Sequence, residues 1–149
     1  KAITAAGPAG GIIAPHVDHV LVAAFSNTRR TAALRAVAQA GSVRRPATSG
    51  GTGTLLPLLL AVWLRWRWLA ARSLRGIDAL QIPEHQGRLR VLSPRLLSFA
   101  HSLGVEVHVW TVNEAIDMRR LLNAGVDGLI TDRADIALAL VAEWAQTRS

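Results

Sequence analysis

The sequence predicts an α/β fold in which short strands alternate with helices and pair in a parallel sheet. The run GVEVHVWTVNEA, from Gly104 to Ala115, alternates like a strand and then leads into a helical pattern. The next strand-like run begins around Asp127, which lies 22 residues after Val105. Strand and helix therefore recur at the spacing of a βα unit, and such units build parallel sheets that are either open or closed into a barrel.

The composition is that of one globular domain. The chain has 149 residues, and half of them are hydrophobic, which is enough for a real core. The absence of cysteine excludes disulfides and thiolate metal sites. The chain starts at Lys1 without a basic stretch and an apolar leader, so we expect no signal peptide and a processed or partial chain.

Positive charge is concentrated in the middle of the chain. The formal net charge is +7. The region from Arg29 to Arg95 has twelve arginines and two acidic residues, a balance of +10, whereas the remainder has a balance of −3. Because no zinc finger or other nucleic-acid module accompanies the arginines, we expect a solvated face and no nucleic-acid partner.

The first clear unit is a strand followed by a helix. The glycines and prolines of residues 7–16 predict a loop, and the valine-rich run from His19 to Phe25 predicts a buried strand. Ser26 or Asn27 can cap the next helix, and Gly41 would end it. Its expected buried face consists of Leu34, Val37 and Ala38.

Residues 42–54, SVRRPATSGGTGT, are rich in turn formers, and a short strand is expected around Ala47 and Thr48. Backbone N–H groups of such a segment could cradle a phosphate. Since no glycine spacing here matches a phosphate-binding fingerprint, we expect a plain loop on either side of the strand.

The segment Leu55–Gly76 combines ten apolar residues with a cluster of tryptophans and arginines. The apolar run ends at Leu64 and is too short to cross a bilayer, which takes about 20 apolar residues. We expect one amphipathic helix. Trp63, Trp66 and Trp68 could lie at a membrane interface or could cover neighbouring elements of the fold. We favour the packing helix, because the segment lacks a clean polar face.

Helix and strand signals continue in the second half. Residues 77–83 alternate and stop at a proline, which predicts a strand. In residues 93–104, Ser93 fits an N-cap, Pro94 the first helical position and Gly104 the residue after the end. The expected buried stripe of this helix consists of Leu96, Leu97, Ala100 and Leu103.

The last part of the chain predicts a helix, a strand and a final helix. Asn113 is the expected N-cap of EAIDMRRLLNA, and Gly125 would end that helix. VDGLITD predicts a short strand, with Asp127 and Asp132 as turn and cap residues. RADIALALVAEWA predicts the final helix. Its shared apolar face consists of Ile136, Leu140, Val141 and Trp144.

The two faces of the strand within the opening run differ in character. Three valines share one face, whereas Glu106, His108 and Trp110 share the other. In a closed barrel the valines would pack on helices, and Trp110 would stand nearest the C-terminal mouth. There the indole would either form a wall for a small substrate or plug the barrel. Glu106 and His108 would form an acid–base pair or, as we favour, satisfy each other's hydrogen bonds.

These residues carry a family resemblance. VHVWTVNEAIDMRRLLNAGVDGLITDRAD, residues 107–135, resembles the C-terminal signature of glycerophosphodiester phosphodiesterases. ALQIPEHQGRLRVLSPRLLSFAHSLG, HVLVAAFSNTRRTAALRA and PATSGG are similar to other segments of that family. The resemblance covers most of the chain after His19.

The resemblance implies a (β/α)₈ TIM barrel of the phosphodiesterase type. Members hydrolyse small glycerophosphodiesters to glycerol 3-phosphate and an alcohol, in lipid and glycerol metabolism. The resemblance also implies a divalent cation, calcium or magnesium, that polarises the phosphoryl oxygens. Trp110 and Phe25 match pocket residues of the family and would line the glycerol end of the substrate. Gln81 and Asn113, near strand ends, are further substrate-binding candidates.

The sequence departs from the family in the motifs of the first strands. It contains neither the His-Arg pair nor the Glu-x-Asp motif that the resemblance would require. We therefore assign no catalytic residue and no metal ligand to this chain. Because a complete barrel takes about 250 residues, we expect residues 1–149 to be the C-terminal part, from about the fifth strand, of a cytoplasmic enzyme.

Such a partial barrel would be inactive alone and would expose sheet edges that favour self-association. The alternative hypothesis is a non-catalytic half-barrel that binds a membrane surface or anionic phosphate through residues 55–76. Membrane association is thus the open alternative, and it is not the one that we favour.

Two clusters of polar residues stay outside this interpretation. His16, Asp18 and His19 could bind a metal, but we expect ordinary loop residues because nothing in the sequence supports their side chains. Glu84 and His85 follow a predicted strand at its carboxyl end, where barrels carry out chemistry, yet we expect loop residues there too.

Overall fold

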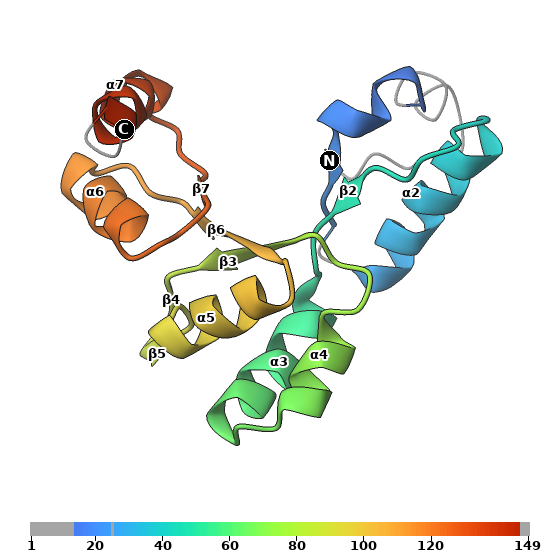
Figure 1. Ribbon diagram of the computed structural model, residues 1–149, viewed down its shortest axis with the longest axis horizontal. Coiled ribbons are helices and arrows are strands. Elements are labelled where there is room, and N and C mark those ends of the chain that lie inside the picture. Colours follow the sequence, from blue (N-terminus) through green and yellow to red (C-terminus); the bar gives the residue numbers. More distant parts are fainter. Residues whose placement is uncertain (1–13, 25, 147–149) are drawn as a thin grey trace. The chain divides into compact units, whose positions relative to one another are not determined.

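The computed structural model describes residues 14–24 and 26–146 (Figure 1). The chain divides into two compact units, residues 1–79 (unit 1) and residues 80–149 (unit 2). Each unit is described by itself.

Unit 1 alternates short strands with helices. Its elements in chain order are the 3₁₀ helix η1 (Ala14–His19), β1 (Leu21–Val22), α2 (Asn27–Gln39), β2 (Ala47–Thr48), α3 (Thr52–Trp63) and α4 (Arg67–Ser73). β1 and β2 pair in parallel over residues 21–22 and 47–48. One isolated parallel bridge joins Ser49 to Ala79, the residue at which the unit ends.

Unit 2 continues the alternation around a three-stranded sheet. The elements are β3 (Ala79–Pro83), β4 (His85–Gln86), β5 (Leu89–Arg90), α5 (Pro94–Ser102), β6 (Glu106–Trp110), α6 (Ala115–Asn123), β7 (Gly128–Leu129) and α7 (Ala134–Gln146). The sheet order is β3-β6-β7, and β6 and β7 are parallel. The predicted α/β fold with parallel strand pairs is therefore confirmed in both units.

The predicted ends of the helices are largely those observed. Ser93 accepts a hydrogen bond from the Leu96 N–H at 3.2 Å, and Pro94 is the first residue of α5. Gly104 follows α5 with φ +68, a backbone conformation that costs glycine nothing. The prediction for Leu103 is wrong. Its side chain is 43% exposed, because the chain has left the helix by this residue.

In α2, only part of the predicted face is buried. Val37 is fully buried, but Leu34 is half-buried and Ala38 is exposed. Ser26 occupies the N-cap position without a side-chain hydrogen bond to the helix. Of the described part of the predicted strand, residues 19–24, only Leu21 and Val22 form β1, and His19 belongs to η1 instead.

The segment that was expected to form one helix forms two. α3 and α4 lie side by side (Figure 1). The chain turns between them at Arg65, which has φ +61. This left-handed conformation is uncommon for a residue with a side chain, so helical periodicity did not predict it. Among the described residues, no helix is long and apolar enough to cross a membrane.

The segment after β3 is also different from the prediction. Glu84 lies in a bend after β3, as expected, but His85 belongs to β4, which forms a short antiparallel hairpin with β5 and pairs His85 with Arg90. The core of unit 2 includes the valine face of β6, since residues 105, 107 and 109 are each at most 3% exposed. The predicted alternation of that strand is confirmed.

Candidate functional site

The opening strand delivers its indole to the carboxyl end of the sheet. Trp110 is the last residue of β6 and is half-buried. Within the part of the chain that the structure describes, its indole makes no hydrogen bond. An amphipathic ring at the end of a parallel strand is suited to contact a small ligand.

The loops that follow β6 and β7 are tied together by Asn113. Its side-chain oxygen accepts hydrogen bonds from the Asp132 N–H at 3.0 Å and from the Thr131 hydroxyl at 3.1 Å. Its side-chain nitrogen donates to the Asp132 carboxylate at 3.2 Å. The prediction that Asn113 caps α6 is wrong. Glu114 occupies the N-cap position, because the Asn113 amide bonds the β7 loop instead.

Glu84, directly after β3, is held by an arginine of α6. Arg120 donates to its two carboxylate oxygens at 2.8 and 2.7 Å, and also to Asp117 at 2.8 Å. The hydrogen bonds from Arg120 hold the pKa of Glu84 below its ordinary value and raise the pKa of Arg120 itself. Glu84 is therefore an ion-pair partner at neutral pH, which does not suit a general acid.

The start of β7 is fixed by a carboxylate. Asp127 accepts a hydrogen bond from the Val107 N–H at 2.8 Å and lies 2.8 Å from Nε2 of His101. Its own N–H donates to the Val107 carbonyl at 3.0 Å. The sequence pattern predicted only a turn residue here. The hydrogen bond to a neighbouring strand was missed because it joins residues 20 positions apart.

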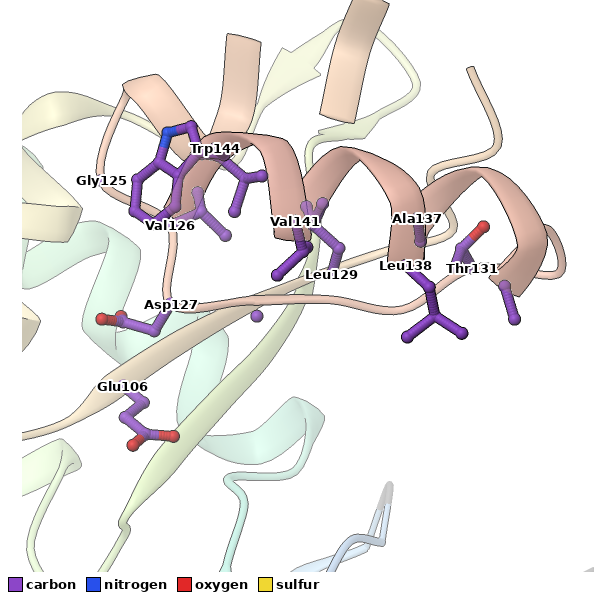
Figure 2. Close-up of a pocket in the computed structure, with 13 residues that line it drawn as sticks. Glu106, Gly125, Val126, Asp127, Leu129, Thr131, Ala137, Leu138, Val141 and Trp144 are labelled. Atoms are coloured by element: carbon purple, nitrogen blue, oxygen red, sulfur yellow. The ribbon is translucent and has the colours of Figure 1, made fainter. Parts of the chain in front are cut away.

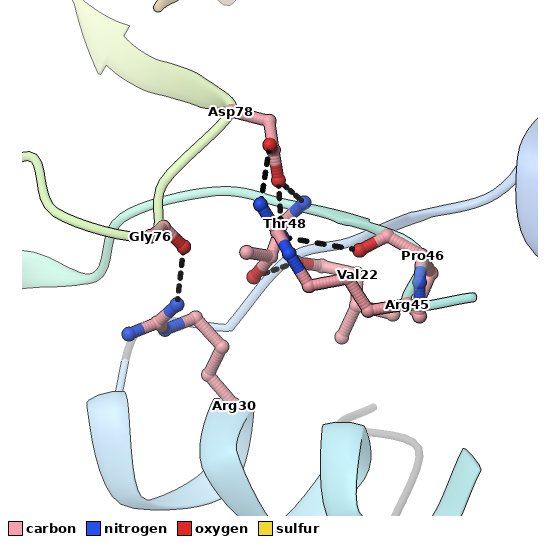
Figure 3. Close-up of polar contacts among 7 residues, drawn as sticks. All are labelled: Val22, Arg30, Arg45, Pro46, Thr48, Gly76 and Asp78. Carbon is pink, nitrogen blue, oxygen red and sulfur yellow. Dashed lines mark hydrogen bonds and ion pairs between the residues drawn. The ribbon is translucent and has the colours of Figure 1, made fainter. Parts of the chain in front are cut away.

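Unit 1 contains the same arrangement at Asp78 (Figure 3). Its carboxylate accepts the Thr48 N–H at 2.8 Å and two hydrogen bonds from Arg45, at 2.7 and 2.8 Å. Partial burial would raise the pKa of Asp78, but the bonds from Arg45 and Thr48 outweigh it and lower that pKa. Close to the Arg45–Asp78 pair in the sequence, the Gly76 carbonyl accepts a hydrogen bond from Arg30 at 3.4 Å.

His108 and Gly128 form a size-matched pair across β6 and β7. They are direct partners in the parallel register. A Cβ atom on Gly128 would lie 2.6 Å from Cδ2 of His108, a contact that cannot form without a shift. His108 Nε2 also lies 2.9 Å from Glu106, so the predicted mutual pair is present. Glu106 is exposed, however, and does not fill an interior.

A groove of about 700 Å³ lies in unit 2, between α7 and the β7 segment. Figure 2 shows Leu138, Val141 and Trp144 along α7, with Glu106 and Asp127 below them. The groove contains neither Trp110 nor any other predicted substrate-binding residue. We therefore do not assign it to the substrate.

The predicted site residues have different fates. Trp110 and Asn113 lie at the carboxyl end of β6 and in the loop after it. Gln81 is half-buried in β3, two residues before the strand ends at Pro83, and its role in substrate binding stays a prediction. Phe25 lies outside the described residues.

The described side chains do not fit a divalent-cation site. Within residues 14–24 and 26–146, no group of three or more histidine, aspartate or glutamate side chains converges as metal ligands would. In the N-terminal trio of polar residues, Asp18 pairs with Arg44 at 3.1 Å, and the side chain of His16 is not among those described.

Comparison with known proteins decides the family. The model of the glycerophosphoryl diester phosphodiesterase family matches residues 20–136. The chain belongs to this family. The resemblance that the sequence predicted is therefore confirmed, and the match includes Trp110 and the Asn113 tie.

Two named relatives of the phosphodiesterase family are similar to this chain. The Mycobacterium tuberculosis protein named "Probable glycerophosphodiester phosphodiesterase 2" is 40% identical over 149 residues, which cover 97% of this chain and 54% of that protein. A glycerophosphodiester phosphodiesterase of Caldanaerobacter subterraneus is 42% identical over 48 residues, 32% of this chain and 20% of the relative. The chain thus spans about half the length of the M. tuberculosis relative.

A solved structure is also similar, at lower identity. It is the crystal structure of a candidate glycerophosphoryl diester phosphodiesterase from Silicibacter pomeroyi DSS-3, with a TM-score of 0.46 and 21% identity. The similarity covers 76% of this chain and 43% of that one.

The family signature acquires a physical meaning in this chain. Asn113 and Asp127 form hydrogen bonds that join loops and strands, and Arg120 binds Glu84. Gly128 leaves room for the His108 ring. Trp110 also belongs to the signature, and within the described residues its indole makes no hydrogen bond. It remains the strongest candidate in unit 2 for contact with a ligand.

Proposed function

We propose that this chain is the C-terminal part of a (β/α)₈-barrel phosphodiesterase that hydrolyses glycerophosphodiesters to glycerol 3-phosphate and an alcohol. In this proposal the 149 residues supply the substrate wall at Trp110 and the frame that positions it. The general acid, the base and the ligands of any cation come from residues outside this chain, which is inactive alone.

The observation that carries the proposal is the family match over residues 20–136. Two further facts support it. Trp110 ends a buried strand at the edge where parallel-barrel enzymes bind substrates. The sequence lacks His-Arg and Glu-x-Asp motifs, and it spans 54% of the M. tuberculosis relative.

The test compares two polypeptides. One is the 149-residue chain, and the other is the chain extended at its amino end by its own reading frame. Both are assayed with glycerophosphocholine, with calcium or magnesium, and with EDTA. We expect metal-dependent release of glycerol 3-phosphate by the extended polypeptide alone.

The two failures can be told apart. Robust turnover by the 149-residue chain would contradict the partial barrel but would support the activity. An extended polypeptide that folds cooperatively and hydrolyses no glycerophosphodiester would contradict the activity itself.

A further inference from the structure

The α3–α4 hairpin of unit 1 exposes an apolar stripe that the fold does not cover. On α3, the residues that face the core are Thr54, Leu58 and Ala61, which are at most 5% exposed. The residues that face away from it are also apolar, namely Leu56, Leu60 and Trp63. A helix that is apolar on all sides is normally buried, so this outer stripe is a surface that favours contact with something else.

The turn of the hairpin adds further exposed indoles. Trp63 is 74% exposed and Trp68 is 67% exposed. Trp66 stacks on Trp68, with ring centroids 6.4 Å apart. We had expected these tryptophans to cover neighbouring elements, and that prediction is wrong. Trp63 precedes the break at Arg65 on the outer face of α3, and Trp66 and Trp68 follow the break.

The charge of the hairpin has one sign. Residues 52–77 contain four arginines and no aspartate or glutamate. Arg72 follows Trp68 by four positions, so it continues the exposed face of α4, and Arg75 lies beyond it. Among the residues that the structure describes, neither Arg72 nor Arg75 makes an ion pair. The exposed surface thus combines leucine, indole and guanidinium groups.

We propose that the α3–α4 hairpin docks the protein on an anionic lipid surface. The leucines and indoles enter the boundary between headgroups and acyl chains, where tryptophan is favoured, and the arginines contact anionic headgroups. A protein partner for this surface would need carboxylates against the arginines and an apolar groove for the stripe. The one-signed charge beside exposed indoles fits lipid better. This inference does not depend on the phosphodiesterase proposal.

The experiment uses the 149-residue chain and sedimentation with vesicles. One set of vesicles contains phosphatidylglycerol and phosphatidylcholine, and the other contains phosphatidylcholine alone. We expect binding to the anionic vesicles at low salt, weaker binding at high salt, and quenching of tryptophan emission by brominated lipid. Electrostatic attraction to lipid is screened beyond about 10 Å at 0.1 M salt, which gives the salt dependence.

Matched variants locate the contact. Trp63→Ser/Trp68→Ser should lower the partition coefficient about tenfold or more, because it removes two membrane-facing indoles. Its control is Ile116→Ser/Leu138→Ser, which removes two exposed apolar side chains of unit 2 and should leave binding unchanged. Circular dichroism verifies that each variant retains its helices.

A second pair of variants tests the charge. Arg72→Gln/Arg75→Gln should lower binding about fivefold for each arginine removed. Arg35→Gln/Arg95→Gln changes the net charge equally at exposed positions outside the hairpin and should have a much smaller effect.

Three results would overturn the proposal. The first is the absence of binding to anionic vesicles at low salt. The second is binding that both hairpin variants retain at the level of their controls, because the contact would then lie elsewhere. The third is self-association that the tryptophan variant abolishes in a chain that binds no vesicles, because the stripe would then be a protein interface.

Discussion

Two strand starts in this chain follow the same rule with different side chains. GIDAL, residues 76–80, leads into β3, and GVDGL, residues 125–129, leads into β7. In both, a glycine with positive φ ends the preceding segment, and a carboxylate two residues later accepts a backbone N–H from the preceding strand. Asp78 bonds Thr48 in unit 1, and Asp127 bonds Val107 in unit 2, each at 2.8 Å.

The difference lies in the residue after each aspartate. Ala79 is opposite Ser49, whereas Gly128 is opposite His108. Ser49 directly follows Thr48, and His108 directly follows Val107, the residues whose N–H groups the aspartates bind. The two strand pairs therefore have the same register. In the first pair, two small side chains share the space between the strands. In the second pair, the large His108 ring fills a similar space, because Gly128 has no side chain. The comparison teaches that Gly128 is fixed by its neighbour's size, since its φ is not in the left-handed region.

The largest effect is expected from Gly128→Ala. The new Cβ would meet the His108 ring at 2.6 Å, so unit 2 should lose about 3 kcal/mol of unfolding free energy. His108→Ser/Gly128→Ala recreates the Ser49/Ala79 pair and should recover most of this loss. Urea unfolding of the four proteins of this cycle measures the coupling. If Gly128→Ala were equally destabilising with His108 and with serine at position 108, the size of the His108 ring would not be the reason for the glycine.

The next effect concerns the shared carboxylate. Asp127→Ala and Asp78→Ala each leave a strand N–H without its acceptor, and each should cost about 2 kcal/mol. The asparagine variants keep an accepting oxygen and should lose less. Urea unfolding measures all four variants. If the alanine and asparagine variants are equally destabilised at only one of the two aspartates, the starts of β3 and β7 are not stabilised by the same mechanism.

A smaller effect is expected from pH at the first start. The pKa of Asp78 is lowered in the folded chain, so its stabilisation is present above the ordinary aspartate value of about 3.9 and is lost as pH falls through the folded value. The difference in unfolding free energy between the parent chain and Asp78→Asn should therefore shrink below about pH 4. A difference that grows on acidification, in melts recorded from pH 7 to 2, would contradict this sign.

The smallest effect is expected from the second partner of each aspartate. Arg45→Ala and His101→Ala remove exposed pairs, so each should cost about 0.5–1 kcal/mol. Thermal melts of the two variants, each with its aspartate variant as the double mutant, give the pair energies. If a side-chain pair energy exceeded the loss caused by removing the acceptor of the backbone N–H, the side-chain partner would be the more important contact of that aspartate, which would contradict this prediction.

The sequence predicted the local signals of this fold well. Ser93, Pro94 and Gly104 bound a helix as expected, and the valine face of β6 is buried, because capping and alternation act between residues close in the chain. The repeated Gly-x-Asp could also have been read from the sequence as a strand start. Its bonding partners could not, since they lie 20 or more residues away.

The site was less predictable than the fold. Asn113 was expected to cap a helix, and it bonds Thr131 and Asp132 because the β6 and β7 loops meet in space. Trp68 is exposed on a second helix that begins only after a break at Arg65, and no periodicity indicates this break. The residue types thus indicated which side chains have a structural or binding role, but they did not predict the contacts that these side chains make.

The most direct test of the proposed function is the kinetics of Trp110→Ala in the amino-terminally extended polypeptide. If Trp110 forms the substrate wall, kcat/KM for glycerophosphocholine should fall about 10- to 100-fold, because the apolar contact to substrate is lost. Trp66→Ala, at an exposed indole of the other unit, should leave kcat/KM unchanged. An unchanged kcat/KM in a folded Trp110→Ala protein would contradict the proposed substrate site.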